Sequence, residues 1–198
     1  MAERGRQARQ ANGNGDAETG ARKGEMSNGR ACVFVDQDYQ DLELWYPVLR
    51  LREAGVEVDI VGRVGTGPNY TGRNGYPCTA TTDSSIVRDQ DYAIVVIPGG
   101  WAPDKLRMDD NVLHIVRRAM AGKRIVAAIC HAGSVLISAG GLAGRHVTSW
   151  PSIRDDLRAA GAVWQDAEVV VDGQLVTSRK PDDLPAFLAA ILRLHGER

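Results

Sequence analysis

The sequence predicts an α/β protein with a mostly parallel sheet and helices on both of its faces. Two observations lead to this fold class. Short apolar runs, each long enough for one buried strand, recur along the chain from residue 31 onward. Between them lie stretches whose apolar residues recur with the spacing of amphipathic helices. Strands that alternate with helices in this way form parallel sheets that are covered on both faces.

The composition is that of an ordinary globular domain. The chain has 198 residues, of which 43% are hydrophobic and 25% charged, and its formal net charge is −1. Such a balance gives no strong field that would recruit nucleic acid or an anionic membrane. No apolar run approaches the roughly 20 residues that are needed to span a bilayer. We therefore expect no nucleic-acid partner and no membrane association.

The chain contains three cysteines, Cys32, Cys78 and Cys130. An odd and sparse set does not indicate a disulfide framework, so we expect a reducing compartment, the cytoplasm. The sequence has no cluster of His, Cys and Asp residues with metal-ligand spacing, and no glycine loop that would cradle phosphate. We therefore expect neither a metal nor a cofactor.

The first 29 residues differ in kind from the rest. Residues 1–29 contain no Val, Ile, Leu or aromatic residue, and they are rich in glycine and in mixed charges. Such a segment cannot bury enough apolar surface to offset the entropy of ordering, and it lacks the apolar core of a secretory signal. We expect a disordered tail over 1–29 and a single domain over 30–198.

The domain opens with a strand, a helix and a second strand. Residues 31–35 (ACVFV) and 56–62 (VEVDIVG) are the expected strands. The helix between them spans about 40–54, is expected to kink at Pro47, and ends at Gly55. The residues expected on its core face are Leu42, Trp45, Val48 and Leu49.

The middle of the chain continues the alternation. The Gly, Asn, Thr and Pro content of residues 64–82 predicts a hairpin or another extended excursion. A third core strand over 93–100 ends in a glycine pair, and a fourth covers 124–129. Two helices are expected, over 112–120 and 132–139.

The C-terminal part holds shorter elements and a final helix. A short strand is expected at 146–150, a helix at 153–160, and two or three short strands within 163–178. Asp172 and Gly173 mark a tight turn among these strands. The last helix has apolar residues at i, i+3, i+4, i+7 and i+8, which are Leu184, Phe187, Leu188, Ile191 and Leu192.

Cys130 stands where a buried strand runs directly into a helix. Its neighbours in AAICHAGS are small, as a strained strand-to-helix turn requires. Such a turn lifts the side chain from the carboxyl edge of the sheet and points helix N-terminal amides at the sulfur. We expect a strained backbone and a depressed thiol pKa, with Cys130 oxidised before the buried Cys32 or a more accessible Cys78. The alternative is a buried structural cysteine.

Five segments carry a resemblance to a known family. They are DLELWYPVLRLREAG, VVIPGGWAPD, AAICHAG, LISAGGLAGRHVTSWP and VVVDGQLVTSRKPDDLPAF. Over about residues 31–194 the chain resembles the ThiJ/PfpI superfamily, which includes a deglycase and bacterial stress proteins. It is most similar to the PfpI endopeptidase-like branch of that superfamily. The resemblance implies a flavodoxin-like sandwich, in agreement with the strand and helix pattern.

The resemblance also implies an active site. Cys130 matches the nucleophile, and Glu43 matches an acidic side chain that contacts its sulfur, so we expect a carboxyl oxygen within hydrogen-bond range. A carboxyl facing a thiolate is pushed towards its protonated form. His131 matches the histidine of a triad, and Asp104 falls where the branch has a Glu from a neighbouring subunit. A homo-oligomer, at least a dimer, follows if Asp104 is donated across the interface. The alternative is that Asp104 caps a helix after Pro103.

Backbone groups around Cys130 are candidates for an oxyanion hole. The glycine pair Gly99 and Gly100 allows close approach of the backbone. The amides of Gly100 and His131 are then candidate donors to a developing negative charge. Trp101 and Trp150 are expected at the pocket, and Trp101 either narrows it or packs in a subunit interface.

Several positions depart from the pattern of this branch. Gln40 stands where relatives often have an acid, Ala132 replaces a glycine, and Lys180 replaces a histidine. Trp150 stands in place of a Tyr and Trp101 in place of an Arg. A shorter side chain at Asp104 than the Glu of the branch also reduces its reach towards His131.

The resemblance implies a cysteine-dependent enzyme that acts on reactive carbonyls, methylglyoxal or glyoxal, or on their early adducts with amines and thiols. Cys130 would attack the carbonyl while His131 moves protons. Two alternatives stay open: an intracellular cysteine peptidase, and a non-catalytic redox sensor or chaperone in which Cys130 is oxidised. A glutamine amidotransferase is disfavoured, because the only late histidine, His195, lies near the end of the last helix.

Overall fold

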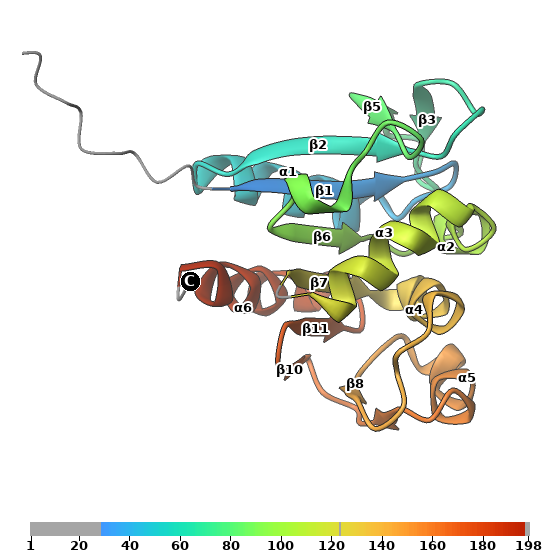
Figure 1. Ribbon diagram of the computed structural model, residues 1–198, viewed down its shortest axis with the longest axis vertical. Helices are drawn as coiled ribbons and strands as arrows, with labels where there is room; N and C mark the ends of the chain where they lie inside the picture. The colour runs from blue at the N-terminus through green and yellow to red at the C-terminus, as the bar shows by residue number, and fades with distance from the viewer. Residues whose placement is uncertain (1–28, 123, 197–198) are drawn as a thin grey trace, which may run out of the picture.

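The computed structural model describes residues 29–122 and 124–196 (Figure 1). Its centre is a seven-stranded sheet with the strand order β10-β11-β7-β6-β1-β2-β5. Neighbouring strands are parallel, except that β10 and β11 are antiparallel. The predicted α/β, flavodoxin-like class is confirmed. The tail expected over 1–29 lies, apart from Gly29, outside the described residues.

Seven strands form the main sheet. In sheet order they are β10 (Val169–Asp172), β11 (Leu175–Ser178), β7 (Ile125–Ile129), β6 (Ile94–Ile97), β1 (Arg30–Val35), β2 (Glu57–Gly62) and β5 (Thr82–Asp83). All residues of β6 and β7 are buried, because helices cover both faces of the sheet at its centre. The predicted excursion contains an antiparallel hairpin of β3 (Asn69–Thr71) and β4 (Pro77–Thr79). A separate parallel pair is made by β8 (His146–Val147) and β9 (Val163–Trp164).

Helices pack on both sides of this sheet. Helices α1 (Asp41–Glu53) and α6 (Leu184–Gly196) contact each other on one face. Helices α2 (Ala102–Leu106), α3 (Asp110–Ala121) and α4 (Gly133–Ala139) pack together on the other face, and α5 (Arg154–Ala159) packs on α4. Figure 1 shows α3 in front of the sheet and α1 behind it. Single 3₁₀ turns lie at η1 (Asp89–Asp91), η2 (Cys130–Ala132), η3 (Pro151–Ile153) and η4 (Pro181–Asp183).

One expectation about the helices needs correction, and one helix was missed. Leu42 and Leu49 were expected on the core face of α1, but their exposed fractions are 57% and 59%. The buried apolar stripe of α1 is Leu44, Pro47, Val48 and Leu51, which is turned from the predicted one. Glu43 is also buried on this inward face, and the helix continues through Pro47. Helix α2 was not predicted, since five residues are too few to show a periodic pattern.

The ends of three parallel strands come together at one edge of the sheet. The chain continues from β1 into the start of α1, from β6 into Gly99 and Gly100, and from β7 into Cys130. The strand order reverses between β1 and β6, and open α/β sheets bind their ligands at such a switch point. Within the described ranges, no helix is both long and apolar enough to span a membrane.

Candidate active site

Cys130 occupies the strained turn that the sequence predicts. It follows β7 directly and has a φ of 63°, the left-handed region that residues other than glycine rarely adopt. Its carbonyl oxygen accepts a hydrogen bond from the backbone N–H of Trp150 at 3.2 Å. Trp150, which lies outside the η2 turn, therefore helps to hold the backbone of Cys130 in this conformation. The prediction of a strained Cys130 is confirmed.

His131 and two backbone amides lie at the Cys130 sulfur. The Nδ1 atom of His131 lies 3.2 Å from Sγ. Hydrogen bonds from the backbone N–H groups of Gly100 and His131 lower the pKa of the thiol, so both amides point at the sulfur. Gly100 reaches this place with a φ of 79° and pairs with Tyr39 in an isolated bridge. These amides are the two that the sequence suggested for an oxyanion hole.

Glu43 is fully buried at the start of α1. Its Oε2 atom accepts a hydrogen bond from the Gly99 N–H at 2.9 Å, while Oε1 is buried and, among the described residues, has no hydrogen-bond partner of ordinary geometry. Burial raises the pKa of this carboxyl to about 7, against the hydrogen bonds from Gly99 and Cys130, which lower it. The group is therefore poised to hold or release a proton near neutral pH.

Gly99 allows the carboxyl and the thiol to lie side by side. A Cβ atom at this position would lie 2.6 Å from both Cys130 Cβ and Glu43 Oε2, and 3.1 Å from Cys130 Sγ. Real side chains do not approach so closely, so any larger residue would separate the two groups. Gln40 is the N-cap of α1, and its Oε1 atom accepts a hydrogen bond from the Glu43 N–H at 2.8 Å. Gln40 departs from the pattern of the PfpI branch, in which relatives often have an acid, and this contact shows its structural role here.

The thiol pKa values contradict one expectation. Burial, followed by the charge of Glu43, raises the pKa of Cys130 to about 12, so the turn does not depress it. The amides oppose this shift, but they are outweighed by the loss of water around the sulfur. Cys78 was expected to be accessible, yet it is buried in the β3–β4 hairpin, and burial raises its pKa to about 11. Cys32 is buried in β1 as predicted, and burial raises its pKa as well.

His131 lies between two indole rings. Trp101 stacks on it at a ring-centroid distance of 6.4 Å, and Trp150 lies at 6.4 Å with a tilt of 34°. Both tryptophans are exposed, by 60% and 40%. Burial, and then the charge of Arg73, lower the pKa of His131. The ring is therefore neutral at neutral pH and can accept a proton.

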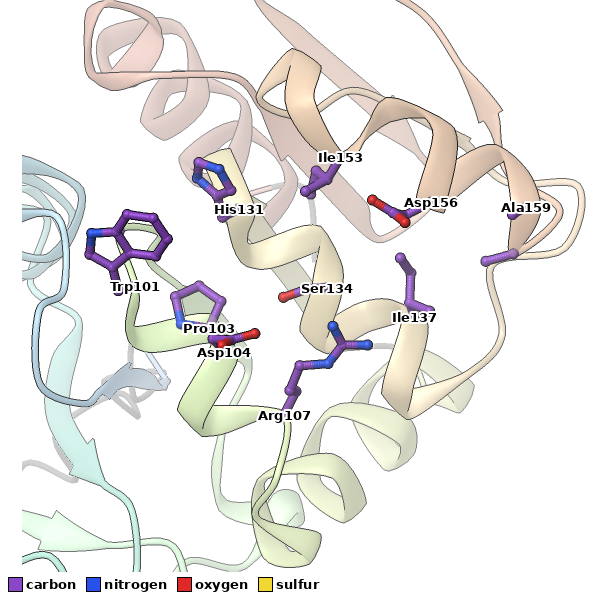
Figure 2. A pocket seen from close by; sticks show the side chains of 12 residues that line it. Trp101, Pro103, Asp104, Arg107, His131, Ser134, Ile137, Ile153, Asp156 and Ala159 are labelled. Atoms are coloured by element: carbon purple, nitrogen blue, oxygen red, sulfur yellow. The ribbon is translucent and has the colours of Figure 1, made fainter.

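A cavity of about 530 Å³ opens beside His131 (Figure 2). Figure 2 shows Trp101 and His131 at one end of it and Asp156 and Ala159 at the other. Asp104 also lines this cavity, from α2. Its side chain is exposed and does not cap α2, which begins after Trp101. In the described part of the chain, Asp104 and His131 share no hydrogen bond, so one subunit alone does not form the predicted triad.

Two neighbours of His131 were not found from the sequence. Ser152 Oγ lies 3.1 Å from His131 Nε2, and Arg73 acts on the pKa of both His131 and Glu43. Ser152 follows Pro151 in a 3₁₀ turn, and Arg73 lies in the loop of the hairpin. Neither position has a periodic or motif signal, because each reaches the site only through the tertiary fold. Within residues 29–122 and 124–196, no group of three or more His, Cys, Asp or Glu side chains is placed to bind a metal.

Comparison with known proteins defines the class of this chain. Residues 29–194 match the DJ-1/PfpI family, and the chain belongs to that family. It is 42% identical to Deglycase PH1704 of Pyrococcus horikoshii, over 83% of this chain and 98% of that protein. A Bacillus subtilis relative, provisionally named the cysteine protease YraA, is 39% identical over 83% of this chain and 97% of its own length.

A solved structure agrees with this assignment. The two-domain protein of Anabaena variabilis with DJ-1/ThiJ/PfpI-like and ferritin-like domains superimposes with a TM-score of 0.82 at 37% identity. The match covers 85% of this chain but only 48% of that protein, so this chain spans about half of its length. The fold and the family predicted from the sequence are thereby confirmed.

Proposed function

We propose that this chain is a cofactor-independent cysteine enzyme that acts on reactive carbonyls such as methylglyoxal and glyoxal, or on their early adducts with amines and thiols. The observation that carries the proposal is the arrangement around Cys130. Its sulfur has a proton acceptor, His131 Nδ1, at 3.2 Å and two backbone amides directed at it. The relatives named deglycases support the same chemistry.

The first step joins the Cys130 sulfur to the aldehyde carbon. With a thiol pKa of about 12, the resting group is a neutral thiol, so its proton must leave as the new bond forms. Neutral His131 accepts this proton at Nδ1. The carbonyl oxygen gains negative charge and is stabilised by the amides of Gly100 and His131 until it is protonated. The product is a hemithioacetal on Cys130.

Glu43 is suited to the second step. A carboxyl with a pKa of about 7 exchanges protons readily at neutral pH. It would move the carbinol C–H proton to the adjacent carbonyl carbon, which oxidises one carbon and reduces its neighbour within the same molecule. The resulting thioester is hydrolysed by water to a hydroxy acid, and Cys130 is released as a thiol. No external oxidant or reductant is required.

A cysteine peptidase is the second candidate, because the Bacillus subtilis relative carries that provisional name. An aldehyde is a more electrophilic target than an amide, and it does not require the complete triad that a single subunit lacks. We therefore place carbonyl substrates first. Assembly into a homo-oligomer, with Asp104 donated to a neighbouring subunit, stays a prediction. The cytoplasm is the proposed location, and all three cysteines are free, as a reducing compartment requires.

Turnover of methylglyoxal tests the proposal. Purified wild-type protein should consume methylglyoxal and release a hydroxy acid without added metal, and Cys130→Ser should abolish this activity, because a serine hydroxyl does not lose its proton to a histidine as readily as a thiol does. Cys78→Ser is the matched control, since this cysteine is buried outside the site. Wild-type rates in Cys130→Ser would refute the proposal. If the wild-type protein cleaves peptides but does not turn over methylglyoxal, the peptidase is favoured. If it has neither activity, the redox sensor is favoured.

A further inference from the structure

We propose that Ser152 is the positioning residue of His131, acting within the same chain. Nε2 of the imidazole lies 3.1 Å from Ser152 Oγ, while Nδ1 lies 3.2 Å from Cys130 Sγ. The ring is therefore held at both nitrogens, by the nucleophile on one side and by a hydroxyl on the other. The proposal rests on the proposed function where carbonyl turnover is measured. Its main test, alkylation of Cys130, does not require turnover.

The turn that carries Ser152 is attached to the nucleophile itself. Trp150, two residues earlier, donates its N–H to the carbonyl oxygen of Cys130 at 3.2 Å. The Trp150 carbonyl accepts from the N–H of Ile153 at 3.2 Å and from Ser149 Oγ at 2.9 Å. Ser149 Oγ in turn accepts from Trp164 Nε1 at 3.0 Å. These hydrogen bonds hold the η3 turn at a fixed distance from Cys130. The turn in this position brings the Ser152 hydroxyl next to the imidazole of His131.

The hydroxyl of Ser152 can serve the tautomer of His131 that the attack requires. A neutral imidazole carries one proton, and it can accept the Cys130 proton at Nδ1 only if its own proton is on Nε2. In this form, Ser152 Oγ is placed to accept a hydrogen bond from Nε2–H, which holds the ring. The same bond persists after Nδ1 has taken up the thiol proton. Ser152 therefore orients the base before and during attack without touching the reacting atoms.

A neutral partner suits the charges around His131. The groups that face the ring or share its cavity are the Cys130 thiol and the charged side chains Arg73, Asp104, Arg107 and Asp156, with the rings of Trp101 and Trp150 at its sides. A carboxylate on Nε2 would raise the pKa of His131, so that more of the resting imidazole would already carry a proton at Nδ1 and could not accept the one from Cys130. A hydroxyl fixes the orientation without adding a negative charge.

This arrangement also bears on Asp104. In the tautomer that accepts the thiol proton at Nδ1, Nε2 has one proton to donate, and Ser152 Oγ at 3.1 Å is placed to receive it. An Asp104 carboxylate from a second subunit would have to replace this hydrogen bond. Ser152 and Asp104 therefore compete for the Nε2 atom of His131. Substituting each residue in turn separates their roles.

The test is the pH dependence of Cys130 alkylation by iodoacetamide, a neutral reagent that reports the reactivity of the thiol without turnover. In Ser152→Ala, the rate at neutral pH should fall by about tenfold or more, because a misoriented base removes the proton less often. Ser152→Thr keeps the hydroxyl and should restore most of the rate. In Ser152→Asp, the pKa of His131 should rise, as seen in its imidazole NMR titration, and the acidic limb of the alkylation profile should move to higher pH.

Ser85→Ala is the matched control, since this serine is exposed and lies outside the site. Thermal unfolding should show that all variants are folded, because Ser152 is exposed as well. The proposal is overturned if Ser152→Ala alkylates with the wild-type rate and pH profile, or if Asp104→Asn changes the profile while Ser152→Ala does not. A slower Ser152→Ala in a protein that turns over no carbonyl substrate would uphold Ser152 and refute the proposed function.

Discussion

At the scale of single residues, the site depends on how closely Glu43 and Cys130 approach across Gly99. Gly99→Ala should disrupt it, because the added Cβ would lie 2.6 Å from atoms of both side chains. We expect a loss of about 1–3 kcal/mol in the free energy of unfolding, typical of overpacking, and a loss of methylglyoxal turnover. Gly196→Ala is the control, because no atom of the part of the chain that the structure describes lies within 4 Å of the added Cβ. Full activity in Gly99→Ala would show that this approach is not needed.

The raised pKa of Glu43 makes stability depend on pH. The folded-state pKa of about 7 lies above the ordinary value of 4.5, so unfolding releases a proton between these two values. The stabilising proton is present at low pH and is lost as the pH rises through 7. The free energy of unfolding should therefore fall by on the order of 3 kcal/mol from pH 4.5 to above pH 7.

Glu43→Gln should remove this contribution. The amide is uncharged at every pH, so urea unfolding across this range should show a flatter dependence than in the wild type. A variant with an unchanged slope would mean that Glu43 does not carry the proton. Methylglyoxal turnover of Glu43→Gln should also fall, by about 100-fold if the carboxyl is the acid and base of the second step.

At the scale of elements, the start of α1 couples helix stability to the site. Gln40 accepts from the N–H of Glu43, so Gln40→Ala should lower the free energy of unfolding by about 1 kcal/mol and reduce turnover by displacing Glu43. Asp109→Ala removes the equivalent contact at α3, where Asp109 accepts from Asn111 N–H. This control should be destabilised but should keep its activity. Equal losses of activity in both variants would contradict the coupling.

The sequence was most informative about long, periodic elements. The buried residues of α3 and α6 and the four core strands follow from apolar spacing, since both faces of the sheet are covered. The face of α1 was predicted only in part: Val48 is buried and Trp45 packs against the core, but Leu42 and Leu49 are exposed. The inward stripe includes the Glu43 carboxyl, which an apolar count cannot recognise. The predicted direction of the Cys130 pKa shift was also wrong, because the burial of a residue in a turn depends on tertiary packing. Ser152 was missed for the same reason.

At the scale of the whole molecule, exposed apolar side chains predict association. Leu42, Trp45, Leu49 and Tyr76 line one cavity of about 650 Å³ between α1 and the β3–β4 hairpin. Light scattering at micromolar concentration should give a mass of at least a dimer. Leu49→Lys should lower that mass if this surface is buried in the assembly. A monomeric wild type would contradict the prediction and would exclude donation of Asp104 from another subunit.

The central claim is that Cys130 forms a covalent bond with a carbonyl substrate. The most direct measurement is mass spectrometry of protein mixed briefly with methylglyoxal and quenched in acid. The wild type should gain the mass of one methylglyoxal molecule, and peptide mapping should locate it on Cys130. Cys130→Ser should gain none at this position. An adduct found only on lysine, arginine or Cys78 while the substrate is turned over would contradict the account.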